Sequence, residues 1–144
     1  MQITLQLLFL QMDFTTAEGF SAPASLWYPQ GIAFDNSLGN GAAGVDWHGY
    51  KDIAHFQSGG SPIGQIHDAT GGAEYFGAIM QPVTPNTSHA ADTASVLATL
   101  ALSHKTAPVL NGDGSAALDA NQQPQMKSPF DGAQIVVLPV TVTL

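Results

Sequence analysis

The sequence contains no cysteine and no arginine, and only three of its 144 residues are lysine. The absence of cysteine excludes disulfide bonds, thiolate zinc sites, iron–sulfur ligation and cysteine nucleophiles. Nucleic-acid binding depends on basic side chains that neutralise phosphates, and a chain with a formal net charge of -8 and three lysines lacks them. The same shortage argues against anionic membrane surfaces and against phosphorylated substrates held by arginine. We therefore expect neither a nucleic-acid partner nor a membrane partner.

Charged residues of both signs are scarce. They make up 10% of the chain, against roughly 25% in an average soluble domain, whereas the hydrophobic fraction of 44% is ordinary. The surface must therefore consist largely of small and uncharged polar side chains. Such a surface suits a subunit that packs against neighbours, because buried charge is costly at an interface. A secreted β-domain with a neutral surface is the alternative interpretation.

Long apolar runs are also missing. No stretch approaches the roughly 20 residues that span a bilayer, and the first 14 residues have neither a basic region nor a small-residue cleavage site typical of a signal peptide. A chain of this length is near the usual size of one domain. We expect a single β-rich domain over residues 1–144 that does not span a membrane.

Both ends of the chain alternate between apolar and polar residues with the two-residue period of a half-buried strand. The first segment carries Ile3, Leu5, Leu7 and Phe9, and the last carries Val136, Leu138, Val140 and Val142. Pro139 has no backbone N–H, so the last strand should lie at a sheet edge or contain a bulge. Terminal strands of this kind would be available to pair with neighbouring molecules.

The interior of the chain predicts short elements separated by turns. Residues 13–49 are rich in glycine and proline and are expected to be loops with short elements such as Ser25–Tyr28. Asp52–Phe56 and Ile63–His67 are predicted to form a hairpin around Ser58–Ser61. A further strand is expected over Ala73–Met80, after a turn at Gly71–Gly72.

The segment Ala90–Ser103 combines helical and alternating patterns, and its alanine content favours helix. Asn111–Pro129 is polar and is predicted to be a long surface loop, and we find no repeat in the sequence. The expected fold class is mainly β: a compact β-sandwich or barrel-like single domain with long loops and one short helix at about 90–103.

One short motif suggests a metal. Asn111-Gly112-Asp113-Gly114 resembles the middle of a calcium loop of the EF-hand or dockerin type. Aligned on that pattern, the first ligand position falls on Val109 and the twelfth on Ala120, and Asp119 is one residue out of register. Asn111, Asp113 and Asp119 are therefore weak calcium candidates, and a turn explains the same residues without a metal. We expect no metal and no cofactor.

Catalytic motifs are absent from the sequence. Five histidines occur without a recognised ligand spacing, although His48, His55 and His67 could converge with Asp46, Asp52 or Asp68. There is no Gly-x-Ser-x-Gly elbow, and the two glutamates give no indication of a carboxylate pair. We expect no catalytic residue, and we expect that the chain is not an enzyme.

Large aromatic residues gather in the first third of the chain. They are Trp27, Tyr28, Phe34, Trp47 and Tyr50. Aromatic side chains of this kind form cores, subunit contacts or platforms on which sugars stack, and the sequence leaves these three roles open. The low charge of the chain fits the second role, so these five residues are our candidates for an interface.

These features together favour a structural subunit of a large assembly. The closest description is a bacteriophage virion protein: a capsid decoration (cement) protein, or a related tail or neck subunit. The expected partners are further copies of the chain, in a homo-oligomer such as a trimer, and other virion structural proteins; the expected location is the virion. The alternative is an extracellular carbohydrate-binding or adhesion β-sandwich module that uses loop aromatics, with or without calcium.

Overall fold

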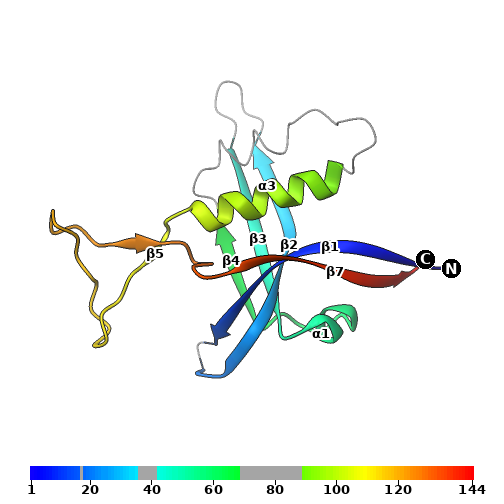
Figure 1. The fold of residues 1–144 in the computed structure, drawn as a ribbon, viewed down its shortest axis with the longest axis horizontal. Coiled ribbons are helices and arrows are strands. Elements are labelled where there is room, and N and C mark those ends of the chain that lie inside the picture. The colour runs from blue at the N-terminus through cyan, green and yellow to red at the C-terminus, as the bar shows by residue number, and fades with distance from the viewer. Residues whose placement is uncertain (17, 36–41, 69–88) are drawn as a thin grey trace.

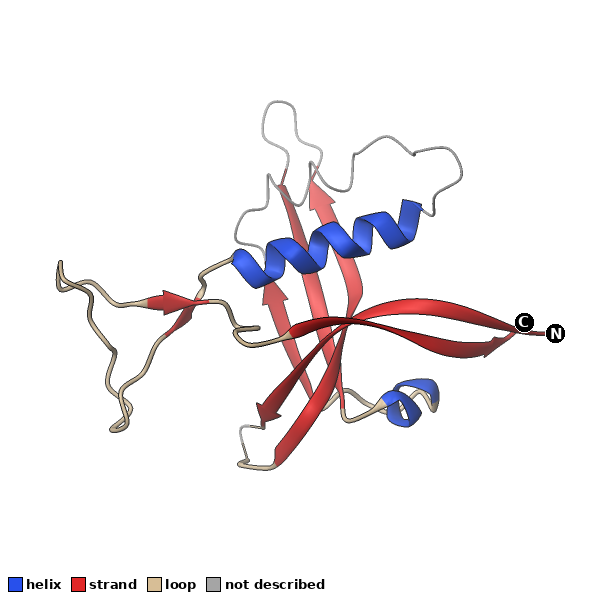
Figure 2. Ribbon diagram, viewed as in Figure 1, coloured by secondary structure: helices blue, strands red, loops and turns tan. Residues whose placement is uncertain are grey.

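The computed structural model describes residues 1–16, 18–35, 42–68 and 89–144, with only the backbone described at 34–35, 42–43 and 89–93. The fold is mainly β with one main helix, as the sequence predicts. Strand order in the principal antiparallel sheet is β4-β3-β2-β1-β7 (Figures 1 and 2). Its strands are β1 (Gln2–Thr15), β2 (Ser21–Asp35), β3 (Ala42–Tyr50), β4 (Gly64–Asp68) and β7 (Gln134–Thr143).

Two helices and a small second sheet complete the described structure. Helix α1 spans Ile53–Gln57 and helix α3 spans His89–Ser103, while β5 (Ala107–Pro108) pairs with β6 (Met126–Lys127). The helix expected at 90–103 is therefore confirmed. Neither described helix is long and apolar enough to cross a membrane.

The two ends of the chain pair with each other, which confirms both predicted terminal strands. β1 and β7 remain in register from Gln2 opposite Thr143 to Gln11 opposite Gln134, and the two termini meet at one end of the molecule (Figure 1). β7 is an edge strand of the sheet, as Pro139 predicts.

β1 changes partner partway along its length. Its pairing with β2 runs only from Leu10, opposite Trp27, towards the end of the strand. In the same register Leu8 would face Pro29, which has no N–H to donate, and the β2–β3 register shifts between Pro29 and Gly31. Among the described strands, residues 2–9 of β1 therefore pair only with β7. With residues 136–143 they form a two-stranded ribbon that we call the terminal ribbon.

Both faces of the sheet carry a cluster of buried side chains. On one face, helix α3 covers a cluster that includes Leu10, Trp27, Trp47 and Phe130. The other face carries a second cluster of Phe9, Leu26 and Val140, against which Ile53 and Phe56 of helix α1 pack. Neighbouring residues of one strand, such as Phe9 and Leu10, thus belong to different cores, because successive side chains point to opposite faces.

The prediction that residues 13–49 are mostly loop is wrong, because β1 extends into this range and β2 and β3 occupy much of it. Glycine reads as a turn signal in the sequence, but in β3 it serves close packing. A Cβ atom on Gly49 would lie 2.6–2.8 Å from three indole carbons of Trp27. Only glycine lets the indole ring lie directly against this strand.

The predicted hairpin of Asp52–Phe56 and Ile63–His67 is also wrong in its first half. Residues 53–57 form helix α1, which begins after Asp52 because the Asp52 carboxylate accepts a hydrogen bond of 2.8 Å from the backbone N–H of His55. The second half is a strand, β4, but it pairs with β3. The strand expected at 73–80 lies outside the described residues.

Candidate interaction surfaces

The most prominent surface feature is an arm formed by residues 105–127, which projects from the body (Figure 1). Three backbone hydrogen bonds close a ring within it: the N–H of Val109 donates to Gln125 O, that of Ala117 to Val109 O, and that of Gln125 to Ala117 O, at 2.8–2.9 Å. The predicted surface loop at 111–129 is exposed as far as Lys127, whereas Ser128 is buried, and its backbone is hydrogen-bonded.

The arm contains a structural repeat of eight residues that sequence comparison within the chain does not reveal. Each unit has a turn in which one residue donates to the carbonyl four positions later: Asn111 to Ser115 and Asp119 to Gln123. Each turn also has a residue with positive φ, Gly114 in the first and Gln122 in the second. The backbone conformation repeats although most side chains differ. The sequence therefore shows no repeat, as stated above, whereas the structure of the arm does.

The arm exposes apolar side chains at the same eight-residue spacing. Leu110, Leu118 and Met126 are 57%, 49% and 41% exposed. Between residues 105 and 127 no side chain is buried, so the arm has no core of its own and is held by backbone and turn hydrogen bonds. Ordered backbone combined with exposed apolar side chains is typical of an element that docks onto another surface.

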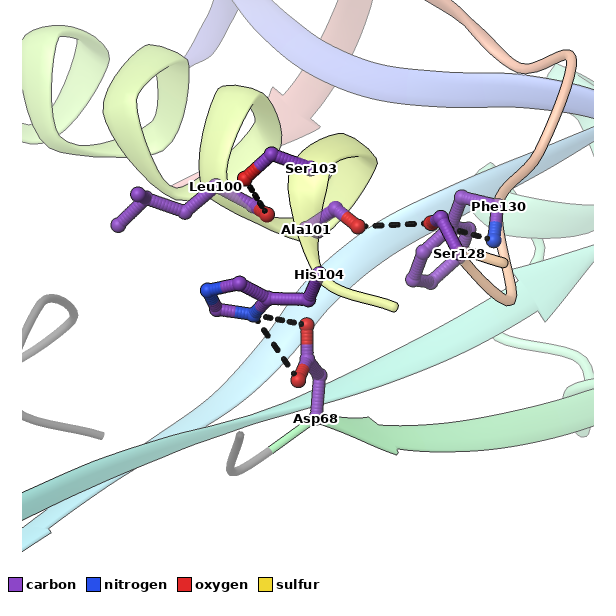
Figure 3. Close-up of polar contacts among 7 residues, drawn as sticks. All are labelled: Asp68, Leu100, Ala101, Ser103, His104, Ser128 and Phe130. Atoms are coloured by element: carbon purple, nitrogen blue, oxygen red, sulfur yellow. Dashed lines mark hydrogen bonds and ion pairs between the residues drawn. The ribbon is translucent and has the colours of Figure 1, made fainter. Parts of the chain in front are cut away.

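Both ends of the arm are fixed to the body by buried polar contacts (Figure 3). At its start, His104 follows helix α3, and its Nδ1 lies 3.0 and 3.2 Å from the two carboxylate oxygens of Asp68 at the end of β4. At its end, the Ser128 hydroxyl donates to the carbonyl of Ala101 at 2.8 Å and accepts from the N–H of Phe130 at 3.0 Å. These contacts set the direction in which the arm leaves the body.

The three calcium candidates lie in the two turns of the arm. The Asp113 carboxylate accepts hydrogen bonds from the hydroxyl and, less strongly, the backbone N–H of Ser115, and these bonds lower the pKa of Asp113 from its ordinary value. Asn111 donates to the Ser115 hydroxyl, while Asp119 accepts from the backbone N–H groups of Asn121 and Gln123 in the next turn. Each side chain thus stabilises its own turn, as the turn interpretation expects.

The two tryptophans among the interface candidates are core residues. Trp27 and Trp47 are both 0% exposed, and both contact Phe130 edge-on, with ring centroids 6.0 and 5.2 Å away. The Trp27 N–H donates to Ser25 Oγ at 3.0 Å, and that hydroxyl donates to Met12 O. Neither indole reaches the surface in this structure.

The tyrosine candidates lie on the opposite face of the sheet. Tyr28 is half-buried and Tyr50 is 7% exposed, and both pack against Phe56 of helix α1 with ring centroids 5.1 and 5.0 Å apart. Burial raises the pKa of Tyr50, whose hydroxyl donates to Gln30. Phe34 lies in β2 opposite Ala43, and its side chain lies outside the described part of the structure.

Two of the aspartates that could have converged on a metal each contact one histidine among the described residues: Asp46 contacts His67 and Asp68 contacts His104. His67 and Asp46 face each other across β4 and β3, 2.6 Å apart, on an exposed surface. His55 accepts a hydrogen bond from the Lys51 N–H, and no group of three possible ligands occurs within the described residues.

A shallow apolar cleft of about 500 Å³ lies beside the turn between β1 and β2. Phe20, Pro23 and Ile63 contribute to its apolar lining. Its polar lining comes from Thr16, Ser21, Lys51 and Asp52, and the Asp52 carboxylate already caps helix α1. Because Asp52 is already engaged in this cap, Lys51 is the one charged side chain of the lining without that role, and the cleft by itself does not indicate a ligand.

Comparisons with known proteins add no assignment to these surfaces: no protein-family model, no curated protein and no solved structure matches the chain.

Proposed function

We propose that this chain is a structural subunit of a large protein assembly, most concretely a capsid decoration protein or a related tail or neck subunit of a bacteriophage virion. The arm carries this proposal. It is anchored at both ends, has no buried side chain between residues 105 and 127, and exposes Leu110, Leu118 and Met126. An arm of this kind gains its stabilisation by covering its apolar residues with a neighbouring subunit.

Charge supports the same function. With a formal net charge of -8, the body would be repelled by packaged DNA and suits the outer surface of a particle. The arm itself carries two aspartates and two lysines, Lys105 and Lys127, so its formal charges balance and it would not be repelled by an acidic neighbour. The carbohydrate-binding alternative has less support, because Trp27 and Trp47 are fully buried.

The test is the mass of the oligomer by light scattering across a concentration series. We expect the unmodified chain to form a stable oligomer, and the triple substitution Leu110→Ser, Leu118→Ser and Met126→Ser to reduce its mass. Phe20→Ser is the control, because Phe20 is 73% exposed but lies outside the arm. A chain that remains monomeric at all concentrations and binds no particle component would contradict the proposal.

A further inference from the structure

The terminal ribbon has an open edge on its β1 side. Met1 and Leu144 exchange hydrogen bonds, with N···O distances of 3.3 and 2.8 Å. Bonded and non-bonded pairs alternate along an antiparallel ladder, so Gln2, Thr4 and Gln6 direct their backbone N–H and C=O groups away from β7. Among the described strands none pairs with this edge, because the β1–β2 register begins only at Leu10.

The opposite edge of the terminal ribbon is less suited to pairing. Pro139 faces Gln6, which belongs to a non-bonded pair, so the proline nitrogen lies on the outer edge of β7. It interrupts the row of donors in the middle of that edge, which is a common protection against strand addition. The β1 edge has no such interruption between Gln2 and Leu8.

The terminal ribbon is also uncharged. No side chain from Gln2 to Met12 or from Ala133 to Leu144 carries a charge, although the chain as a whole has a net charge of -8. Exposed edge strands commonly carry lysine or other charged residues that prevent association, and this edge carries none. Two acidic copies could therefore approach each other at this surface without placing like charges in contact.

The sequence of the edge is nearly symmetrical about Thr4. It reads Gln2-Ile3-Thr4-Leu5-Gln6, so two copies related by a two-fold axis at Thr4 place glutamine opposite glutamine and threonine opposite threonine. Ile3 of each copy then faces Leu5 of the other. Self-complementarity of this kind is what an isologous interface requires.

We propose that the β1 edge of the terminal ribbon pairs antiparallel with the same edge of a second copy, about a two-fold axis at Thr4. Two backbone hydrogen bonds form in each of the pairs Gln2–Gln6, Thr4–Thr4 and Gln6–Gln2. The contact joins two ribbons into a four-stranded sheet and covers Leu5, which is 40% exposed in the single chain. It rests on the proposed assembly function, for which it supplies one specific contact between subunits.

A single cysteine tests the geometry directly, because the chain has no other. In Thr4→Cys the two Cα atoms would lie about 5.5 Å apart, within the roughly 4.4–6.8 Å that a disulfide spans. Thr141→Cys is the matched control, since Thr141 lies directly opposite Thr4 in the terminal ribbon. Its two copies would be separated by three strand spacings, or about 14 Å, and could not form a disulfide. Mild oxidation should therefore give a covalent dimer of Thr4→Cys and none of Thr141→Cys.

Charge at the same two positions gives an independent readout. Both Thr4→Lys and Thr141→Lys lose the contact between the two threonine hydroxyls, 3.5 Å apart, so their effects on folding are matched. Like charges directly opposite each other should raise the dimer dissociation constant of Thr4→Lys at least about tenfold, and that of Thr141→Lys much less. Circular dichroism of both variants confirms that the fold is retained.

The outcomes separate this contact from the proposed function. Self-association of the unmodified chain that neither Thr4 variant changes would overturn the β1 contact and leave the assembly function standing. A Thr4-dependent dimer that grows no further and is insensitive to the arm substitutions would support the contact and contradict the assembly function. Equal effects at Thr4 and Thr141 would also overturn the contact.

Discussion

Gly49→Ala is expected to be one of the most damaging single-methyl changes in this protein. The added Cβ would lie 2.6, 2.7 and 2.8 Å from Cζ2, Cε2 and Cη2 of Trp27, well inside the distance at which carbon atoms repel. Trp27 cannot move aside, because it is 0% exposed and is held by the hydrogen bond to Ser25 and by edge contacts with Phe14 and Phe130. The strand or the indole must therefore shift as a whole.

Overpacking of a well-filled core costs about 1–3 kcal/mol, and three simultaneous close contacts favour the upper end. We expect urea unfolding to show a loss of about 3 kcal/mol and a fall in Tm of roughly 10 °C. Gly31→Ala is the control, because its Cβ would meet only Asp46, at 3.6 Å. It should change the unfolding free energy by less than about 1 kcal/mol, in the stabilising direction, because it restricts the unfolded chain. Equal stability of the two variants would refute the packing argument.

Three further predictions follow from buried or turn hydrogen bonds. Ser128→Ala removes both contacts at the end of the arm and should lower the free energy of unfolding in urea by about 1–3 kcal/mol. The substitution should also raise the hydrogen-exchange rate of the arm amides more than that of the sheet amides. Trp27→Phe should cost about 1 kcal/mol more than Trp47→Phe, because the Trp27 N–H has an acceptor whereas that of Trp47 has none among the described residues; equal losses would contradict this reasoning. Ser115→Ala should raise the pKa of Asp113 towards its ordinary 3.8, measured by carboxyl NMR titration. In the unmodified chain the lowered pKa means that the turn bonds are intact above pH 3.8 and are lost only as the pH falls through the lower folded value.

The parts of the fold that the sequence predicts well are those in which one residue pattern has one structural solution. The alternating residues of the two chain ends can bury an apolar face only as strands, and Pro139 restricts the last strand to an edge. Glycine and proline in residues 13–49 have more than one use. Pro29 ends a ladder within a long strand and Gly49 accommodates an indole, so neither marks a loop, and only the contact partner distinguishes these uses.

The arm shows why its surface could not be found from sequence. Its repeat lies in backbone hydrogen bonds, which many residues can make, and Gln122 even takes the positive φ that Gly114 takes one unit earlier. A faint signal exists in the spacing of Leu110, Leu118 and Met126, but three apolar residues in a polar segment do not identify a repeat by themselves. The aromatic residues gave a stronger signal, and the structure places Trp27 and Trp47 in the core.

The symmetry of the two proposed contacts constrains what they can build together. Pairing of the β1 edges is isologous and closes after two copies. The arm and the terminal ribbon project in different directions (Figure 1), so the arm is free to contact a third molecule when the ribbons are paired. If the arm binds a different surface on its neighbour, that contact is heterologous and generates a ring or an open array. When each chain of one ring pairs through its β1 edge with a chain of a second ring, the two rings together contain an even number of chains. Light scattering should then give an even multiple of the chain mass for the unmodified protein, half that mass for Thr4→Lys, and a dimer for the arm triple variant. An odd multiple would rule out this combination of the two contacts.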